Sequence, residues 1–220
     1  MKNLVAATAL SLLFSGTAFA HDREARDVVV DHDLSGFDSI EVMGVYELDV
    51  RIGEGFSVRT EATDKDAKRL DVEVDGSTLV LSTDTDKKRW NMRAEENRAI
   101  LAVITLPRLE SLEVVGVATG DLSGFDGGDV DVEVAGVAEL ELTGTCDRLD
   151  IEVAGVGEVD ASGLRCTDVE ATLGGVGNLS VYASESIEAD SGGIGEIEVY
   201  GDPAERDVDD GFMSKVRFRS

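Results

Sequence analysis

The chain has 220 residues, of which 46 are acidic and 20 are basic, so its formal net charge at pH 7 is −26. This charge excludes nucleic acid as a partner and makes anionic membrane surfaces poor ones, because phosphate binding requires basic patches and an acidic surface repels phosphate. The length is ample for one domain with a full hydrophobic core.

Residues 1–20 have the features of a secretory signal peptide. Lys2 precedes an apolar run over residues 4–14, and Ala18-Phe19-Ala20 fits the small-x-small rule for cleavage before His21. The apolar run is too short to cross a bilayer, and the sequence contains no second run of this kind. We therefore expect a periplasmic or extracellular protein with no stable membrane insertion.

Residues 21–36 are expected to form a loose N-terminal segment. This segment holds both histidines of the chain, His21 and His32, so a Ser-His-Asp or Cys-His site lacks a credible base. We therefore predict no catalytic residues and a protein that is not an enzyme.

The next part of the chain contains strand-like runs without a regular period. Residues 40–50 alternate around Gly44 in the same way as the repeats described below, and the period is then lost until Gly116. Residues 64–69 predict a helical turn, and the polar residues 83–98 predict a mobile hairpin or loop. Further strands are expected over residues 57–61, 70–74, 78–82 and 100–106.

A short phrase centred on one glycine recurs along the chain, and each of these glycines is expected to mark a bend. The last five glycines are separated by 20, 19, 20 and 18 residues. A near-constant period of this size is typical of stacked units that share one continuous core. The six repeat glycines are Gly44, Gly116, Gly136, Gly155, Gly175 and Gly193.

Apolar and acidic residues alternate on both sides of each repeat glycine. With the glycine as position zero, positions −6, −4, −2, +4 and +6 are mostly apolar, whereas −5, −3, +3 and +5 are mainly acidic. A period of two predicts half-buried strands. Two strands and two turns per repeat predict an all-β fold, a parallel β-solenoid with coils of about 18–20 residues. An up-and-down barrel is the alternative, but its hairpins would not require the same phase in every repeat.

Position +1 is Val or Ile after each of the last five glycines, which makes it a candidate interaction ladder. Strict alternation would expose these side chains beside the acids, as a face for a partner or for self-association. Alternatively, an unusual φ at the glycine flips the phase and buries them in the corner. We favour burial, because large exposed aliphatic patches are rare on soluble monomers. The residues are Val117, Val137, Val156, Val176 and Ile194.

Stacked coils would also align the acidic residues in columns about 4.8 Å apart. Each like-charge contact costs on the order of 1 kcal/mol in water before screening by salt. No cofactor is expected, and we interpret the columns as a solvated outer face, with binding of Ca²⁺ as the alternative. Two of these columns are Asp131, Asp150, Glu170 and Glu188, and Glu113, Glu133 and Glu152.

Cys146 and Cys166 are the only cysteines, and each lies nine residues before the next repeat glycine. Equivalent positions in adjacent coils lie within the Cα separation that a disulfide needs, and an exported chain meets oxidising conditions. We therefore favour a disulfide over a stacked pair of reduced, buried thiols.

The motifs of the chain resemble those of a known bacterial family. They are the opening strand Ile40-Glu41-Val42, the phrase Ile104-Thr105-Leu106-Pro107, the serial Gly-x-Gly phrases from Gly155 onward, and Tyr200-Gly201-Asp202-Pro203. Residues 37–203 look like the family described as “putative auto-transporter adhesin, head GIN domain”, DUF2807. The resemblance implies a right-handed parallel β-helix, bends at the Gly-rich phrases, and adhesion as the suggested role. The family phrase has Ser where this chain has Val or Ile.

The last residues, 204–220, are expected to form a poorly ordered C-terminal tail. For the whole chain we predict a secreted, non-enzymatic adhesion or binding module of the cell envelope. Its partner is expected to be an envelope protein or a glycan, and self-association into a homo-oligomer is a further candidate. The alternative function is a carbohydrate-active β-helix enzyme that uses outward Asp and Glu residues.

Overall fold

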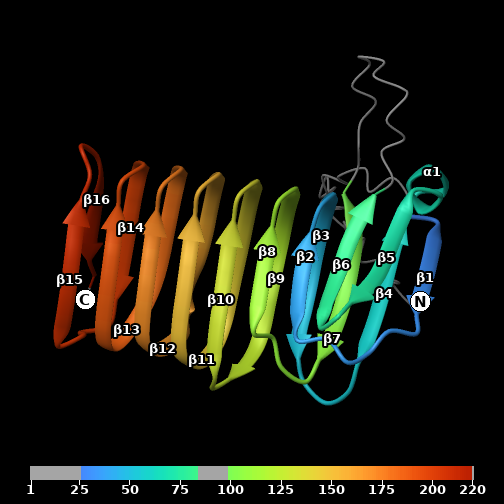
Figure 1. The fold of residues 1–220 in the computed structure, drawn as a ribbon, viewed down its shortest axis with the longest axis horizontal. Coiled ribbons are helices and arrows are strands. Elements are labelled where there is room, and N and C mark those ends of the chain that lie inside the picture. The colour runs from blue at the N-terminus through green and yellow to red at the C-terminus, as the bar shows by residue number, and fades with distance from the viewer. Residues whose placement is uncertain (1–25, 84–98, 220) are drawn as a thin grey trace, which may run out of the picture.

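The computed structural model describes residues 26–83 and 99–219. The predicted signal peptide, His21 and nearly all of the predicted loop at 83–98 lie outside these ranges. The described residues form one short helix and sixteen strands (Figure 1). The elements of the first half are β1 (Val28–His32), β2 (Ser39–Val42), β3 (Val45–Ile52), β4 (Ser57–Ala62), α1 (Asp64–Ala67), β5 (Leu70–Asp75), β6 (Thr78–Thr83) and β7 (Ile100–Leu106). Those of the second half are β8 (Ser111–Val114), β9 (Val117–Asp126), β10 (Asp129–Val134), β11 (Val137–Val153), β12 (Val156–Leu173), β13 (Val176–Ser191), β14 (Ile194–Tyr200), β15 (Glu205–Asp210) and β16 (Met213–Phe218).

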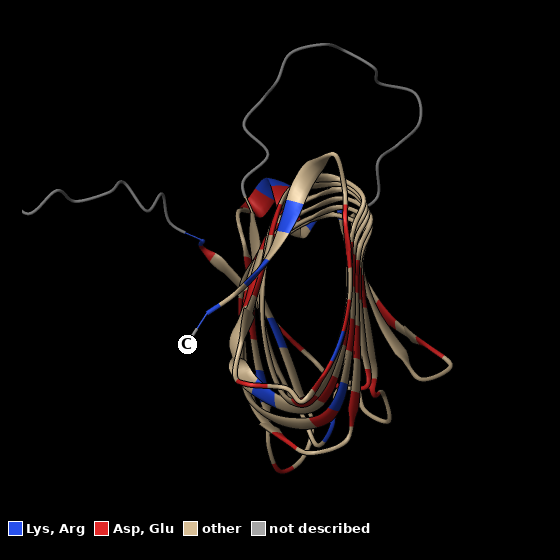
Figure 2. Cartoon of the chain, turned by 90° about the vertical axis from the view of Figure 1, so that its left-hand side faces the viewer, with Lys and Arg blue, Asp and Glu red and all other residues tan. Residues whose placement is uncertain are grey.

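The second half is a β-solenoid with parallel, in-register coils, which confirms the predicted fold class. Val137 pairs with Val117 of the preceding coil and with Val156 of the following coil, so the steps are 20 and 19 residues. Each coil has two faces joined at the repeat glycine, and the view along the axis shows a flattened, closed section (Figure 2). We call the strand segments before each glycine the first face and those after it the second face. β11, β12 and β13 each begin on the second face and continue into the first face of the next coil.

The interior is filled by the predicted apolar positions. Val134, Val153 and Leu173, all at position −2, are fully buried, and so are Leu142 and Val181 at position +6. Side chains in successive coils stack on their equivalents, because the strands pair without a shift through most of their length. The alternation seen in the sequence therefore produces one continuous core.

An additional coil explains why the period is lost between Gly44 and Gly116. β6 and β7 pair in parallel with β2 and β3, on the side away from β8 and β9. β5 then pairs antiparallel with β6, and β4 with β7, and β1 closes the end by pairing with β4. The helical turn predicted over 64–69 is present as α1, whose N-cap is the Thr63 side chain. This end of the solenoid is covered by antiparallel strands.

Two expectations about the ends of the domain are wrong. Residues 28–32, expected to belong to a loose segment, form β1. Residues 205–218, expected to be part of a poorly ordered tail, form β15 and β16, which pair with β13 and β14 as a further coil. Backbone pairing to a preformed neighbouring strand orders these charged segments, although their composition offers little apolar burial.

Each repeat glycine lies at a bend, but the reason differs from the predicted one. None of the six has a positive φ. Instead, a Cβ atom on Gly155 would lie closer than 3.0 Å to the carbonyl oxygens of Ala135 and Gly136 in the coil below. The amides of Ala154 and Gly155 both donate to the Val134 carbonyl, at 2.9 Å, and Val156 N donates to the Gly136 carbonyl, also at 2.9 Å. These hydrogen bonds hold the backbones so close that only glycine fits.

The predicted cysteine pair lies on the turn opposite the glycine bend. Cys146 and Cys166 are register partners, both are buried, and a disulfide joins them across a Cα separation of 4.5 Å. The bond therefore ties two adjacent coils together where the chain passes from the second face to the first.

The close contact of Gly155 with the backbone of the coil below can be tested by substitution. Gly155→Ala is expected to lower the free energy of unfolding by about 2 kcal/mol or more, because the new methyl group overlaps backbone atoms that cannot move independently. Gly174→Ala is the matched control, since nothing lies within 4 Å of its Cβ position and its φ is ordinary. Urea unfolding should show the control within about 1 kcal/mol of the wild type, on the stabilised side. Equal stabilities of the two variants would contradict the packing explanation.

Reduction of the disulfide is expected to lower the free energy of unfolding by about 3 kcal/mol, because it releases a closed loop of about 20 residues in the unfolded chain. Urea unfolding with and without reductant measures the difference. The Cys146→Ser/Cys166→Ser variant should match the reduced wild type and show no response to reductant. An intact mass that is unchanged by reduction and alkylation would show that the thiols are free.

Candidate binding face

The Val or Ile after each glycine is exposed, so the expectation of burial is wrong. Val117, Val137, Val156, Val176 and Ile194 are 37% to 51% exposed. The bend does not flip the phase: Leu173 at −2 and Leu179 at +4 both point inward, and Ala118 at +2 is buried. Position +1 must therefore point outward.

These side chains form one continuous row on the second face. Val117 pairs with Val45 at one end of the row, and Ile194 pairs with Met213 at the other. We call the full row the aliphatic ladder. Its six steps of about 4.8 Å make it about 29 Å long. Its members are Val45, Val117, Val137, Val156, Val176, Ile194 and Met213.

Acidic side chains lie beside most of the ladder, at positions +3 and +5 of the same strands, with neutral residues at Thr119 on β9 and at Asn178 and Ser180 on β13. Along the first four residues of the ladder, from the coil of Val45 to the coil of Val156, they border a shallow hollow of about 630 Å³. Its lining includes Thr119 and Gly120, at the positions that Glu139 and Leu140 occupy in the next coil. We call this the acidic hollow, and its carboxylates belong to Glu47, Asp49, Asp121, Glu139, Glu141, Glu158 and Asp160.

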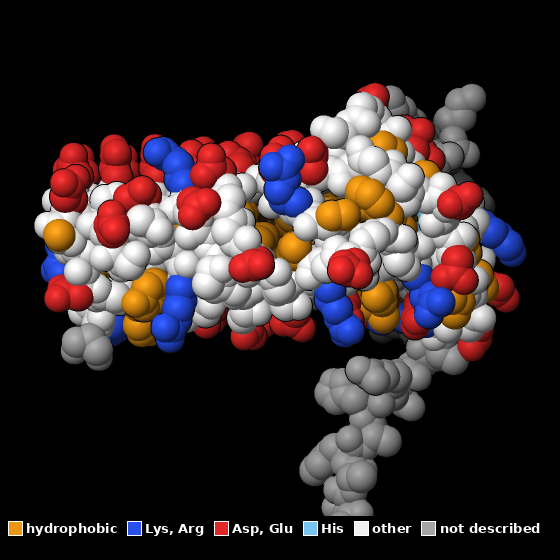
Figure 3. Space-filling model, turned by 90° about the horizontal axis from the view of Figure 1, so that it is seen from below, with side chains coloured by type: hydrophobic (Ala, Val, Ile, Leu, Met, Phe, Trp, Pro, Cys, Tyr) orange, Lys and Arg blue, Asp and Glu red, His pale blue; other side chains and the backbone are white. Residues whose placement is uncertain are grey.

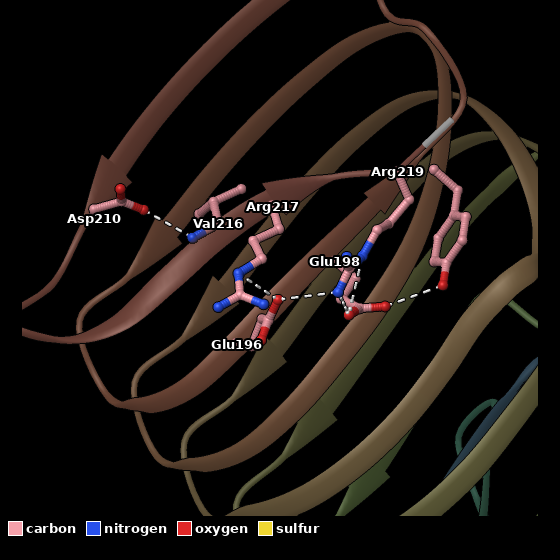
Figure 4. A network of polar contacts seen from close by, with 7 residues as sticks. Glu196, Glu198, Asp210, Val216, Arg217 and Arg219 are labelled. Carbon is pink, nitrogen blue, oxygen red and sulfur yellow. Dashed lines mark hydrogen bonds and ion pairs between the residues drawn. The ribbon is translucent and has the colours of Figure 1, made fainter.

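At the two ends of the second face, the protein's own arginines neutralise these acidic columns. Arg26 pairs with Glu47, and Arg51 pairs with Asp49 at 3.0 Å. At the other end, Figure 4 shows Arg217 of β16 and Arg219, just after β16, against two acids of β14. Arg217 lies 3.0 Å from Glu196, while Arg219 pairs with Glu198 and, at 3.5 Å, with Glu196.

The same network tunes the ionisation of the terminal acid. Hydrogen bonds from Arg219 and then from Tyr200 lower the pKa of Glu198, and the bond to Glu198 raises the pKa of Tyr200. The middle coils differ from this arrangement. Within residues 26–83 and 99–219, no lysine or arginine forms a salt bridge with the middle acids Asp121, Glu139, Glu141, Glu158 and Asp160.

The first face carries the other acidic columns. Asp131, Asp150, Glu170 and Glu188 follow one another in register, as do Glu113, Glu133 and Glu152. Partial burial, with the nearby carboxylates of Glu41 and Glu133, raises the pKa of Glu113. Partial burial, with Asp150 and Glu133, likewise raises the pKa of Asp131. Acidic side chains also line the long edges of the surface seen in Figure 3.

The described residues offer little for catalysis or for metal binding. His32 is the one histidine among them, and its Nε2 lies 2.9 Å from Thr60 Oγ1 in the terminal β1–β4 pair. Burial lowers the pKa of His32, with Asp31 opposing that shift. Both cysteines are consumed by the disulfide. No group of three or more His, Cys, Asp or Glu within the described ranges is arranged to hold a metal ion. The solvated outer face stays the prediction for the acidic columns, with Ca²⁺ binding as its alternative.

Two parts of the face were not foreseen from the sequence. Met213 extends the ladder into a coil that was expected to be disordered, although Gly211, against the Ser191 carbonyl, offered a signal of one more bend. The acidic hollow depends on Gly120, whose place among Leu48, Leu140 and the acids follows only from the register with the inserted N-terminal coils.

These features define a class of protein: a parallel β-solenoid with an exposed, continuous row of aliphatic side chains on one face. The sequence matches the model of the family described as “Putative auto-transporter adhesin, head GIN domain”, DUF2807, over residues 36–203, and the chain belongs to this family. No curated protein matches the sequence.

A solved crystal structure shows the same fold. It is that of a “putative adhesin” from Bacteroides fragilis, which is 23% identical in sequence and superposes with a TM-score of 0.67. The alignment covers 87% of this chain and 96% of the Bacteroides fragilis chain. A “putative lipid binding protein” from Parabacteroides distasonis is 20% identical over 87% of this chain and 93% of its own, with a TM-score of 0.49. In the described ranges, no helix has the length and apolar character needed to span a membrane.

The raised pKa values on the first face lead to a pH-dependent prediction. Glu113→Gln removes a charge that the fold disfavours, so it should raise the free energy of unfolding at pH 7, by about 0.5 kcal/mol at most because the site is solvent-screened. A carboxyl group with a raised folded pKa binds its proton more tightly in the folded state, so wild-type stability gains as pH falls through that pKa. The advantage of the variant should therefore shrink over the same range.

Urea unfolding between pH 7 and pH 4 measures this effect. Glu54→Gln, at an exposed position in the loop after β3, is the control with the same charge change. An equal and pH-independent gain in both variants would assign the effect to net charge instead of to the column.

Proposed function

We propose that this protein is an exported, non-enzymatic adhesion or binding module of the cell envelope, and that its working surface is the second face of the solenoid. The observation that carries the proposal is the aliphatic ladder, an in-register row of half-exposed Val, Ile and Met side chains over seven coils. Family membership supports adhesion as the general role. The predicted signal peptide supports export.

The ladder has the composition of an interface core. Apolar area buried on binding contributes about 25 cal/mol per Å². Charged residues are typically depleted at the centre of an interface and found at its rim, and here the acids of positions +3 and +5 border the ladder. A row of aliphatic side chains with no partner in the described chain costs solubility, so a role in contact with another molecule accounts for its repetition.

The scaffold also favours binding. The parallel hydrogen bonds fix each inner strand between two neighbours, and hydrogen bonds at the bends fix the five ladder residues from Val117 to Ile194. Little backbone freedom is lost when such a surface binds, so more of the contact energy appears as affinity. The proposed partner is an envelope component, a protein or a glycan.

Labelled protein should bind to envelopes of the organism that makes it, and disruption of the ladder should reduce that binding. The Val137→Thr/Val156→Thr/Val176→Thr variant keeps side-chain shape while making the ladder polar, and we expect a loss of roughly tenfold or more in affinity. Val29→Thr/Val208→Thr is the matched control, because both residues are exposed valines outside the ladder.

Circular dichroism and unfolding should show both variants folded, since solvent-exposed substitutions change stability by about 0.5 kcal/mol or less. Absence of wild-type binding to any envelope fraction, or equal losses in both variants, would overturn the proposal.

A further inference from the structure

We propose that the occupant of the second face is a cationic amphipathic helix of a partner protein, with its apolar side on the aliphatic ladder and its basic side in the acidic hollow. The inference rests on the proposed function, because it names the partner of the same face. It requires three things of the surface: a row of matching length, a lateral spacing that one helix can span, and an uncompensated charge of the right sign.

The dimensions of the ladder suit a helix that runs along the solenoid axis. The ladder advances about 4.8 Å per coil, and a helix advances 5.4 Å per turn, so one apolar residue per turn stays close to one ladder residue over several coils. A length of about 29 Å corresponds to roughly 20 helical residues. A partner strand in this direction would cross the coils and could not extend their hydrogen bonding, because the strand edges of the inner coils are already paired.

The lateral spacing also suits one helix. Positions +1 and +5 on a strand are about 13 Å apart, and a helix with its side chains is about 10–12 Å wide. Val137 and Glu141 are such a pair on β11, and Val156 and Asp160 are the pair on β12. Leu or Val on one flank of a helix would therefore reach the ladder, while Lys or Arg on the adjacent flank would reach the hollow.

The charge distribution selects a cationic partner. At both ends of the face the acidic columns meet the protein's own arginines, as Glu196 and Glu198 meet Arg217 and Arg219 (Figure 4). β16 thus shows how basic side chains over these columns engage them. In the middle coils the same positions, including Glu139 and Glu158, have no salt bridge to a described lysine or arginine. An added row of basic side chains would complete there the pattern that the ends already show.

A second copy of the chain is a poorer occupant. Apposing two second faces would bring two acidic hollows together, and like charges facing each other across an interface are strongly unfavourable. Anionic lipid surfaces are repelled in the same way. The aliphatic ladder and the acidic columns together therefore favour a partner that is both apolar and basic.

The test uses a synthetic helical peptide of about 20 residues, with Leu on one flank and Lys on the adjacent flank, and a scrambled peptide of the same composition. Isothermal titration to the full-length mature protein at about 0.15 M salt gives the affinities. The amphipathic peptide should bind roughly tenfold or more tightly than the scrambled one. The triple Val→Thr ladder variant should abolish that difference, while Val29→Thr/Val208→Thr should preserve it.

A second pair of variants separates the hollow from general electrostatics. Glu139→Gln/Glu158→Gln removes a register pair of the hollow, and Glu133→Gln/Glu152→Gln removes a register pair of the first face with the same change in net charge. Only the first variant should weaken the amphipathic peptide, by roughly tenfold, and reduce the salt dependence of binding. Equal effects of the two variants, or equal binding of the two peptides, would overturn the proposal.

Two outcomes name other occupants and would also overturn it. A concentration-dependent dimer that the ladder variant abolishes would assign the face to a second copy. Peptide binding that emerges only after Lys87, Lys88 and Arg89 are changed to Ser would assign it to the chain's own basic segment. Failure of the peptide while the ladder variant still loses envelope binding would reject the helix and leave the proposed function standing, so the two failures are distinguishable.

Discussion

The structure depends on the contact between successive repeat glycines. At Gly116, Gly136, Gly155 and Gly175, two consecutive amides donate to one carbonyl of the coil below. At these four bends and at Gly193, a Cβ atom would overlap the carbonyl oxygen of the preceding repeat glycine. Because the bends are held in this way, neighbouring coils cannot slide along one another. The remaining positions of the repeat then stack in register as well. This stacking produces the continuous core, the Cys146–Cys166 disulfide and the exposed aliphatic ladder. A helix bundle or a sandwich can adjust side-chain contacts one at a time, whereas here the backbone sets the alignment first.

In-register stacking repeats each residue type of the unit once per coil, so that equivalent residues form a continuous row. An apolar residue at an inward position becomes a row of core, and an acidic residue at an outward position becomes a column of like charges about 4.8 Å apart. Partial burial, and after it the neighbouring carboxylates, raise the pKa of Glu113 and of Asp131 in such columns. Opposite charge enters at isolated points, through Arg148 beside Glu170 on the first face and through the terminal arginines of the second. In the middle coils the carboxylates still repel one another. A basic partner that binds there relieves this repulsion, which makes the free energy of binding more favourable.

Much of this architecture could be predicted from the sequence, because period-two alternation and a constant repeat length carry the same information as strand pairing. The half-buried strands, the aligned acids such as Asp131 and Asp150, and the equivalence of Cys146 and Cys166 all follow from it. The orientation of Val156 did not follow, because the role of Gly155 was attributed to an unusual φ, whereas its Cα packs on backbone at an ordinary φ. β1, β15 and β16 were missed for a different reason. Their order comes from pairing to a strand edge that exists only in the folded chain, and their own residues are largely exposed. The stacking order of β6 and β7 outside β2 and β3 likewise depends on tertiary pairing.

On the second face, the acidic side chains and the aliphatic ladder act together to select a partner. An isolated row of seven aliphatic side chains would promote self-association, and the acids that flank it oppose that association by facing their own copies across any symmetric contact. The same acids attract a basic partner, so one set of residues discriminates between self and non-self through the sign of the partner's charge. This discrimination requires that the acids beside the ladder carry no salt bridge and that the ladder stays exposed. Glu139 and Glu158 meet the first requirement, since no described lysine or arginine pairs with them. The terminal arginines Arg217 and Arg219 are compatible with this scheme, because they pair with the acidic columns at the end of the face and leave its middle available.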